Sequence, residues 1–144
     1  MALTLAIMTQ IRARLATLTS AGASVKAFVG DPPSNPGLPF VFVWGPPTLA
    51  TSDAMSGCGG DVDVRLHVQV VAATTANVLD LADQVAALLT GEVPTVEGWR
   101  CFPLKHVGVT DVRSDNSTVS APANRSPRYC TITLRARATP LKEA

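Results

Sequence analysis

Two long stretches of the chain alternate between apolar and polar residues, and this alternation constrains the fold more than any other feature. The first stretch runs from Asp61 to Val71, and the second runs from Arg128 to Ala138. Alternation with a period of two places every second side chain on the same face of a β-strand. Each stretch therefore predicts a long strand with one buried and one polar face, and other elements have to cover the buried faces.

Two stretches with helical periodicity can supply this cover. Apolar residues recur every three or four positions over Leu3–Leu18 and again over Val78–Leu89. The first helix is expected to end near Ser20-Ala21-Gly22. Thr74 or Thr75 can cap the second helix, and a glycine just past its last turn predicts its end.

The remaining apolar stretches predict shorter strands. They are Val25–Val29, Phe40–Trp44, Trp99–Phe102 and Lys105–Val112. Because two helices are too few to cover both faces of a sheet, the sequence predicts the α+β class, as a two-layer sandwich with a mostly antiparallel sheet and two helices packed on one face. The length of 144 residues fits a single domain, 1–144, with long flexible loops near 46–60 and 113–127.

The strand expected at Phe40–Trp44 is apolar at every position. A strand that is apolar on both sides predicts that part of the open sheet face is covered in the working molecule. A neighbouring subunit would cover it, as would the long loop folding back. Phe40, Phe42 and Trp44 are therefore candidate subunit-interface residues.

Charge is nearly balanced in total but uneven along the chain. The net charge of +1 argues against nucleic-acid binding through bulk electrostatics, which needs a basic face. Residues 53–97 carry seven acids and one base, whereas residues 100–142 carry eight bases and two acids. This asymmetry can arise by chance, since folding can mix the two halves. If folding keeps it, copies of the chain can associate head to tail and close into a ring.

Two short charged rows stand out on the predicted polar strand faces. Asp61, Asp63 and Arg65 form one row, and Arg135 and Arg137 form the other. Carboxylates two residues apart can serve acid–base catalysis, but any solvated strand face has this spacing, and we favour a solvated or subunit-contact role. Our hypothesis is that the first row on one subunit meets the second row on the next. The rows can equally pair within one subunit if their strands are neighbours.

Motifs that carry enzyme chemistry or bind cofactors are missing from the sequence. It has no G-x-S-x-G nucleophile motif, and the glycine-rich turn 57–60 is not followed by a helix, as a phosphate-binding loop requires. His67 and His106 fall on separate predicted strands without a metal-ligand pattern. The three cysteines contain no C-x-x-C pair, which favours a reducing compartment. We expect no enzyme activity, no cofactor and no metal site.

The sequence also predicts no membrane association. No apolar run reaches the roughly 20 residues that a membrane-spanning helix needs. The apolar start Met1–Met8 has no basic residue before it, so it lacks the order of a signal peptide.

Several passages together carry a resemblance to a known family. They are the proline-rich passage into an apolar strand at Leu38–Trp44, the alternating strand Asp61–Val71, the helix start Thr74-Thr75-Ala76-Asn77, the passage Trp99-Arg100-Cys101 and the closing strand Arg128–Leu134. In this order they resemble the tail terminator, or tail completion, proteins of long-tailed bacteriophages. These are minor tail proteins, and the form resembled here occurs in phages or prophages of actinobacterial hosts.

The resemblance implies a structural virion protein without enzyme activity. Proteins of this family form a ring, commonly a hexamer, that caps the tail tube at full length and offers the surface for head attachment. The implied partners are further copies of the chain, the tail tube protein and the head–tail connector proteins, with DNA passing through the ring lumen. The implied location is the head-proximal end of the virion tail, with assembly in the host cytoplasm.

Other classes of protein stay open at this point. A head-side connector or neck protein of the head–tail joint would have a similar size and would also form a ring. It would bind the portal assembly rather than the end of the tail tube. A small ligand-binding domain would stay monomeric at every concentration. A small α+β enzyme would need a concave site with a perturbed titratable group, and the sequence offers none.

Overall fold

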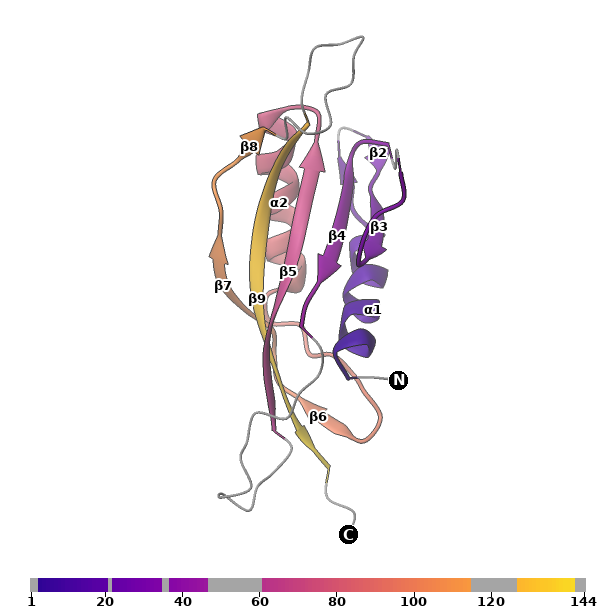
Figure 1. The fold of residues 1–144 in the computed structure, drawn as a ribbon, viewed down its shortest axis with the longest axis vertical. Coiled ribbons are helices and arrows are strands. Elements are labelled where there is room, and N and C mark those ends of the chain that lie inside the picture. Colours follow the sequence, from indigo (N-terminus) through magenta and orange to yellow (C-terminus); the bar gives the residue numbers. More distant parts are fainter. Residues whose placement is uncertain (1–2, 21, 35–36, 47–60, 115–126, 142–144) are drawn as a thin grey trace.

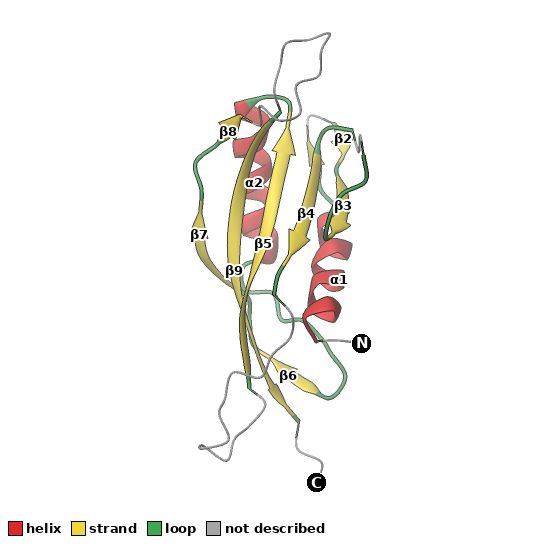
Figure 2. Cartoon of the chain, viewed as in Figure 1, coloured by secondary structure: helices red, strands yellow, loops and turns green. Residues whose placement is uncertain are grey.

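The structure, a computed structural model, describes residues 3–20, 22–34, 37–46, 61–114 and 127–141. Its elements are α1 (Leu3–Leu15), β1 (Thr19–Ser20), β2 (Ala23–Ser24), β3 (Lys26–Val29), β4 (Phe40–Trp44), β5 (Val62–Ala72), α2 (Thr75–Leu89), β6 (Trp99–Cys101), β7 (Lys105–Val109), β8 (Arg113–Ser114) and β9 (Arg128–Pro140). Strands β3 to β9 form one sheet, and α1 and α2 both lie behind it in Figure 1. Figure 2 separates the helices from the sheet that they cover by colour. The predicted α+β class is confirmed.

The two alternating stretches are neighbours in the sheet. β5 and β9 pair antiparallel over the whole of β5, from Val62 opposite Ala138 to Ala72 opposite Arg128. β4 lies on the other side of β5, and β3 follows as the edge strand. The short strands β6, β7 and β8 all pair with β9. β3 pairs parallel with β4 and the other pairings are antiparallel, which confirms the mostly antiparallel sheet.

The core lies between the sheet and the helices. Alternate residues of β5 and β9 are buried, as their sequence pattern predicts. The large, fully buried side chains include Ile7, Ile11 and Leu15 of α1, Leu81 and Leu89 of α2, and Val41, Val43, Leu66, Ile132 and Leu134 of the sheet. Removing this apolar surface from water is the main favourable contribution to folding.

Helix α1 ends earlier than its periodicity predicts. The pattern places the end near Ser20-Ala21-Gly22, but the helix stops at Leu15. The N–H groups of Thr17 and Leu18 then bond to carbonyls three residues back, which tightens the last turn. β1 and β2 follow as a short antiparallel pair, with Gly22 between them at a φ of 82°. Leu18 is still buried, which explains why the helical spacing extends to it.

Helix α2 begins and ends where the sequence predicts. Thr74 caps it, because its Oγ1 accepts a hydrogen bond of 3.2 Å from the N–H of Asn77. Gly91 follows the last turn with a φ of 87°, a left-handed conformation that glycine adopts without strain. Asp80 and Asp83 lie on the exposed side of the helix.

Two predicted boundaries change at the edge beside β9. β7 ends at Val109 rather than at Val112, and its register shifts at a β-bulge between His106 and Gly108. Arg113–Ser114 pairs with β9 as β8, so these two residues of the loop predicted at 113–127 form a strand. The predicted loop residues 47–60 and 115–126 lie outside the described residues.

Candidate interaction surface on the open sheet face

The sheet face opposite the helices, called the open face here, carries a row of aromatic side chains. Phe28 of β3 meets Phe40 edge to face with ring centroids 6.3 Å apart. Along β4, Phe40 stacks on Phe42 at 6.2 Å, and Phe42 stacks on Trp44 at 5.2 Å. Trp44 in turn lies 5.2 Å from the ring of His67 on β5. We call Phe28, Phe40, Phe42 and Trp44 the aromatic row.

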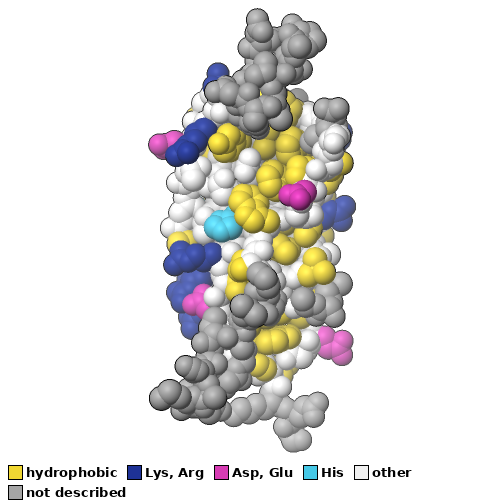
Figure 3. All heavy atoms as spheres, in the orientation of Figure 1, with side chains coloured by type: hydrophobic (Ala, Val, Ile, Leu, Met, Phe, Trp, Pro, Cys, Tyr) yellow, Lys and Arg dark blue, Asp and Glu magenta, His cyan; other side chains and the backbone are white. Residues whose placement is uncertain are grey.

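The pleat of β4 explains why this row exists. Val41 and Val43 point to the helices and are fully buried, so Phe40, Phe42 and Trp44 point to the open face. The structure therefore places the three predicted interface residues together, and each is half-buried. Hydrophobic side chains form a patch on this face in Figure 3, with basic side chains gathered at its flank. Their role in contacts between subunits stays a prediction.

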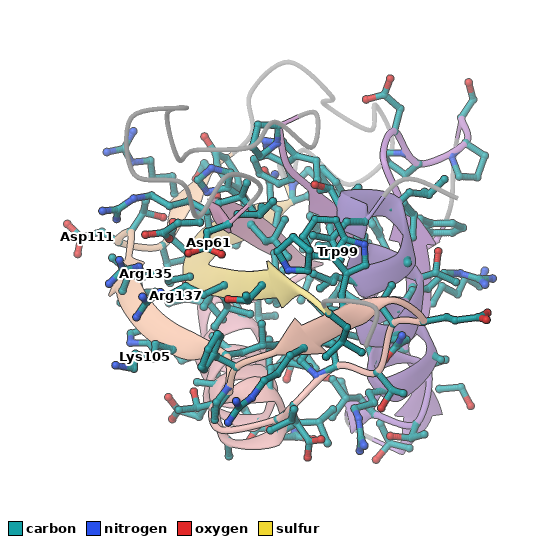
Figure 4. The ribbon with its side chains drawn as sticks, turned by 90° about the horizontal axis from the view of Figure 1, so that it is seen from below. Asp61, Trp99, Lys105, Asp111, Arg135 and Arg137 are labelled. Carbon is teal, nitrogen blue, oxygen red and sulfur yellow. The ribbon has the colours of Figure 1, made fainter. Side chains whose placement is uncertain are left out.

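The basic flank is built by three neighbouring strands. Arg65 of β5 lies directly opposite Arg135 of β9, and Arg135 lies directly opposite Lys105 of β7. We call these three residues the basic row. Arg137 lies two residues further along β9, and Figure 4 shows Lys105, Arg135 and Arg137 on the same side of the molecule. Like charges directly opposite each other on adjacent strands destabilise a sheet.

Arg137 makes a cation–π contact next to the basic row. Its guanidinium lies 5.6 Å from the centroid of the Phe102 ring, and that of Arg100 lies 5.7 Å from the same ring. Phe102, Arg137, Asp61 and Asp63 also line a depression at the start of β5. The two predicted charged rows therefore come together at one end of the open face.

One ion pair joins the two predicted charged rows within the same chain. The Nε of Arg135 donates to Oδ1 of Asp63 at 2.8 Å, and its Nη2 donates to Oδ2. Asp63 reaches Arg135 diagonally, since Arg137 is its directly opposite partner in the register. For Asp63 and Arg135 the structure therefore shows an ion pair within one subunit, between neighbouring strands. A contact of the same rows between subunits stays a hypothesis.

The ion pair shifts the pKa of both of its side chains. The hydrogen bonds from Arg135 lower the pKa of Asp63 from its usual 3.8, against the opposing effect of burial and with help from the charges of Arg135, Arg137 and Arg65. The same hydrogen bonds raise the pKa of Arg135. Both side chains remain more than one third exposed, so solvent screens the pair.

We predict that this pair stabilises the fold at neutral pH and stops doing so in acid. A carboxyl whose pKa is depressed by folding stabilises the folded state above its unfolded pKa, near 3.8. That contribution is lost as the pH falls below 3.8 and through the lower folded pKa. Nuclear magnetic resonance titration of the Asp63 carboxyl measures this directly. Arg135→Gln should raise the measured pKa, and an unchanged value in the variant would contradict the assignment.

The two cysteines that the structure describes have raised thiol pKa values, and His67 contacts the neighbouring strand. Burial raises the pKa of Cys130, with a further effect from the Asp83 carboxylate, and burial raises that of Cys101 as well. A raised pKa makes a thiol less reactive. His67 Nδ1 lies 3.1 Å from Thr133 Oγ1 on the neighbouring strand. Among the described residues, no three histidine, cysteine or acidic side chains gather as a metal site requires.

Two parts of this surface could not be predicted from the sequence pattern. Phe28 adds an edge ring to the aromatic row, and its strand pairs in parallel with β4, which periodicity cannot indicate. Lys105 joins the basic row because β7 pairs with β9. The charge asymmetry along the sequence was the only signal for it.

The described residues include no helix with the length and apolar character that crossing a membrane requires.

Comparison with known proteins gives one family and one fold. The family described as "Tail completion protein gp17" has a sequence model that matches residues 9–122. Among solved structures, the fold is similar to that of a chain in the "Virion of native gene transfer agent (GTA) particle", with a TM-score of 0.59 and 18% sequence identity. The match covers 96% of this chain and 95% of that chain. No curated protein matches the sequence.

Proposed function

Since the chain belongs to the tail completion protein gp17 family and is therefore a structural protein of phage tails, we propose that it forms a ring that caps the tail tube. The ring stops tail growth at full length and provides the surface to which the head attaches. It then lies at the head-proximal end of the tail, after assembly in the host cytoplasm. The family match over 9–122 is the observation that carries this proposal.

The open face supports assembly into a ring. Its aromatic row is only half-buried in the single chain, and exposed apolar patches of this kind mark protein–protein contacts. Phe40, Phe42 and Trp44 would be covered by the next subunit. A single chain repeated head to tail closes into a ring when the rotation between neighbours allows it, and a homohexamer is the expected number.

The remaining partners follow from the position of the ring. One side meets the tail tube protein, the other meets head–tail connector proteins, and DNA passes through the lumen. We propose no catalytic activity, because the family consists of structural tail proteins. The chain acts as a single domain, 1–144, in which one core supports the whole interaction surface.

Electron microscopy of particles from a phage with a disrupted copy of this gene tests the proposal. We expect overlong or ragged tails beside separate, full heads, because nothing stops tube growth or prepares the joint. Tails of normal length beside heads that have lost their DNA would instead indicate a head-side connector. Intact, infectious particles would overturn an assembly role.

A further inference from the structure

The basic row carries positive charge that folding of the described residues leaves unneutralised. Asp63 pairs with Arg135 at the centre of the row, which leaves Arg65 on one side and Lys105 on the other. Both of these side chains are exposed, and neither forms an ion pair with another described residue. A row of like charges across three strands costs stability, and an anionic partner would relieve this repulsion.

The outward face of α2 has the opposite charge. Asp80 and Asp83 are exposed there, beside Leu79, whose side chain is 53% exposed. Helix α2 contains no basic residue. Gln84 donates a hydrogen bond of 2.9 Å to Asp80, and neither aspartate forms an ion pair with another described residue. The helix therefore presents acidic and apolar groups on the side that faces away from the sheet.

These two surfaces lie on opposite layers of the same molecule, as Figure 1 shows for the sheet and α2. They cannot meet within one chain, but they can meet between two copies. The open face offers aromatic and basic groups, and α2 offers Leu79 with two carboxylates. We infer that the open face of one copy binds the outer face of α2 on the next copy. This inference rests on the proposed ring, because it names the head-to-tail contact from which the ring would be built.

A nucleic acid fits the open face less well than a second copy does. Single-stranded nucleic acids stack their bases on free aromatic faces beside basic residues. In the aromatic row, Phe40, Phe42 and Trp44 stack on one another with interplanar angles of 22° and 28°. Their ring faces are therefore already turned toward neighbouring rings. Apolar edges and a basic flank remain, and these match an amphipathic acidic helix.

Charge reversal on each surface provides the test. One variant carries Arg65→Glu and Lys105→Glu, which alters neither Asp63 nor Arg135. The other carries Asp80→Lys and Asp83→Lys. Each variant alone opposes like charges across every contact, so we expect the concentration for half-assembly to rise on the order of 100-fold. All four side chains are exposed, so each variant should shift the melting temperature by only a few degrees.

Mixing the two variants in equal amounts gives the decisive result. In an alternating ring, each basic open face meets an unchanged acidic α2, and each acidic open face meets a basic α2. We expect the mixture to regain assembly, measured by analytical ultracentrifugation and native mass spectrometry. A loss of stability within one chain could not be rescued in this way. If a charge-reversed variant fails to fold, a neutral variant replaces it. These neutral variants are Arg65→Gln with Lys105→Gln, and Asp80→Asn with Asp83→Asn. Each should also weaken assembly, by less than the charge reversal does.

The possible outcomes separate this inference from the proposed function. A wild-type ring with rings in both variants would overturn the α2 contact and leave the ring intact. Variants that fail alone and also fail together would equally exclude α2 as the partner. Loss of DNA binding in the open-face variant, with assembly unchanged, would assign the basic row to nucleic acid. A wild type that forms no ring, with or without tail tubes, would overturn the proposed function itself.

Discussion

Leu66→Ala is expected to lower the free energy of unfolding by about 2–5 kcal/mol, which is a large part of the roughly 5–15 kcal/mol that holds a domain of this size folded. Leu66 is fully buried on β5, between β4 and β9. Truncation removes its contacts and leaves a cavity that the packed sheet fills only in part. Urea unfolding followed by circular dichroism measures the loss.

Gly45 makes this prediction more specific. A Cβ atom at Gly45 would lie 2.5 Å from Cδ2 of Leu66, so Gly45→Ala should destabilise the wild type by forcing a buried side chain to move. In the Leu66→Ala background that obstacle is gone. We therefore expect the double variant to be more stable than the sum of the two single changes predicts, which is the sign of coupled neighbours.

Leu79→Ala is the matched control for the core prediction. The same chemical change is made on a side chain that is 53% exposed, so it should alter the stability by about 0.5 kcal/mol or less. Equal losses at Leu66 and Leu79 would contradict the packing described for β5. Strict additivity of Gly45→Ala and Leu66→Ala would contradict the contact between them.

The sequence predicts the elements whose pattern reflects burial. β5 and β9 alternate because one face of each packs on the helices, and α2 is marked by both an apolar stripe and the Thr74 cap. These signals are local, and they are strong in this chain. The number and order of predicted helices and strands indicate the α+β class, and this inference does not require knowing which strands pair in the sheet.

Features that depend on pairing between distant segments are harder to predict. The helical spacing predicts too late an end for α1, because Leu18 is buried at that spacing although it lies beyond the helix. Pairing of Arg113–Ser114 with β9 and the β-bulge in β7 depend on which strand lies opposite. The ion pair between Asp63 and Arg135 is a further case, since it required β5 and β9 to be adjacent. The sequence allows pairing within one subunit or between subunits, and the register of β5 and β9 brings this one pair together within the chain.

Phe42→Ser is expected to abolish tail completion while the chain still folds. Phe42 lies in the middle of the aromatic row, stacked between Phe40 and Trp44. The side chain is half-buried, so its loss removes two aromatic contacts worth about 1 kcal/mol each and some buried apolar surface. Most folded domains remain folded after a loss of stability of this size. At a subunit contact the same ring would be fully covered, and removing a central aromatic there typically costs 2 kcal/mol or more in every interface of the ring.

Two measurements on the same variant separate folding from assembly. Thermal unfolding of the purified protein should show a modest decrease in melting temperature. Complementation of the disrupted gene should fail, with the same overlong or ragged tails as the disruption alone. Phe42→Tyr keeps the ring and its stacking, so it should restore normal particles.

Val109→Ser serves as the control for exposed apolar surface in general. Val109 is 58% exposed on β7, outside the aromatic row, and its replacement should leave particles normal. If Val109→Ser and Phe42→Ser gave the same phenotype, loss of hydrophobic surface anywhere would explain both. If Phe42→Ser gave normal tails, the open face would not be the subunit contact. Because repeated interfaces multiply a small loss in each contact, a ring is more sensitive to one buried aromatic side chain than the single folded chain is.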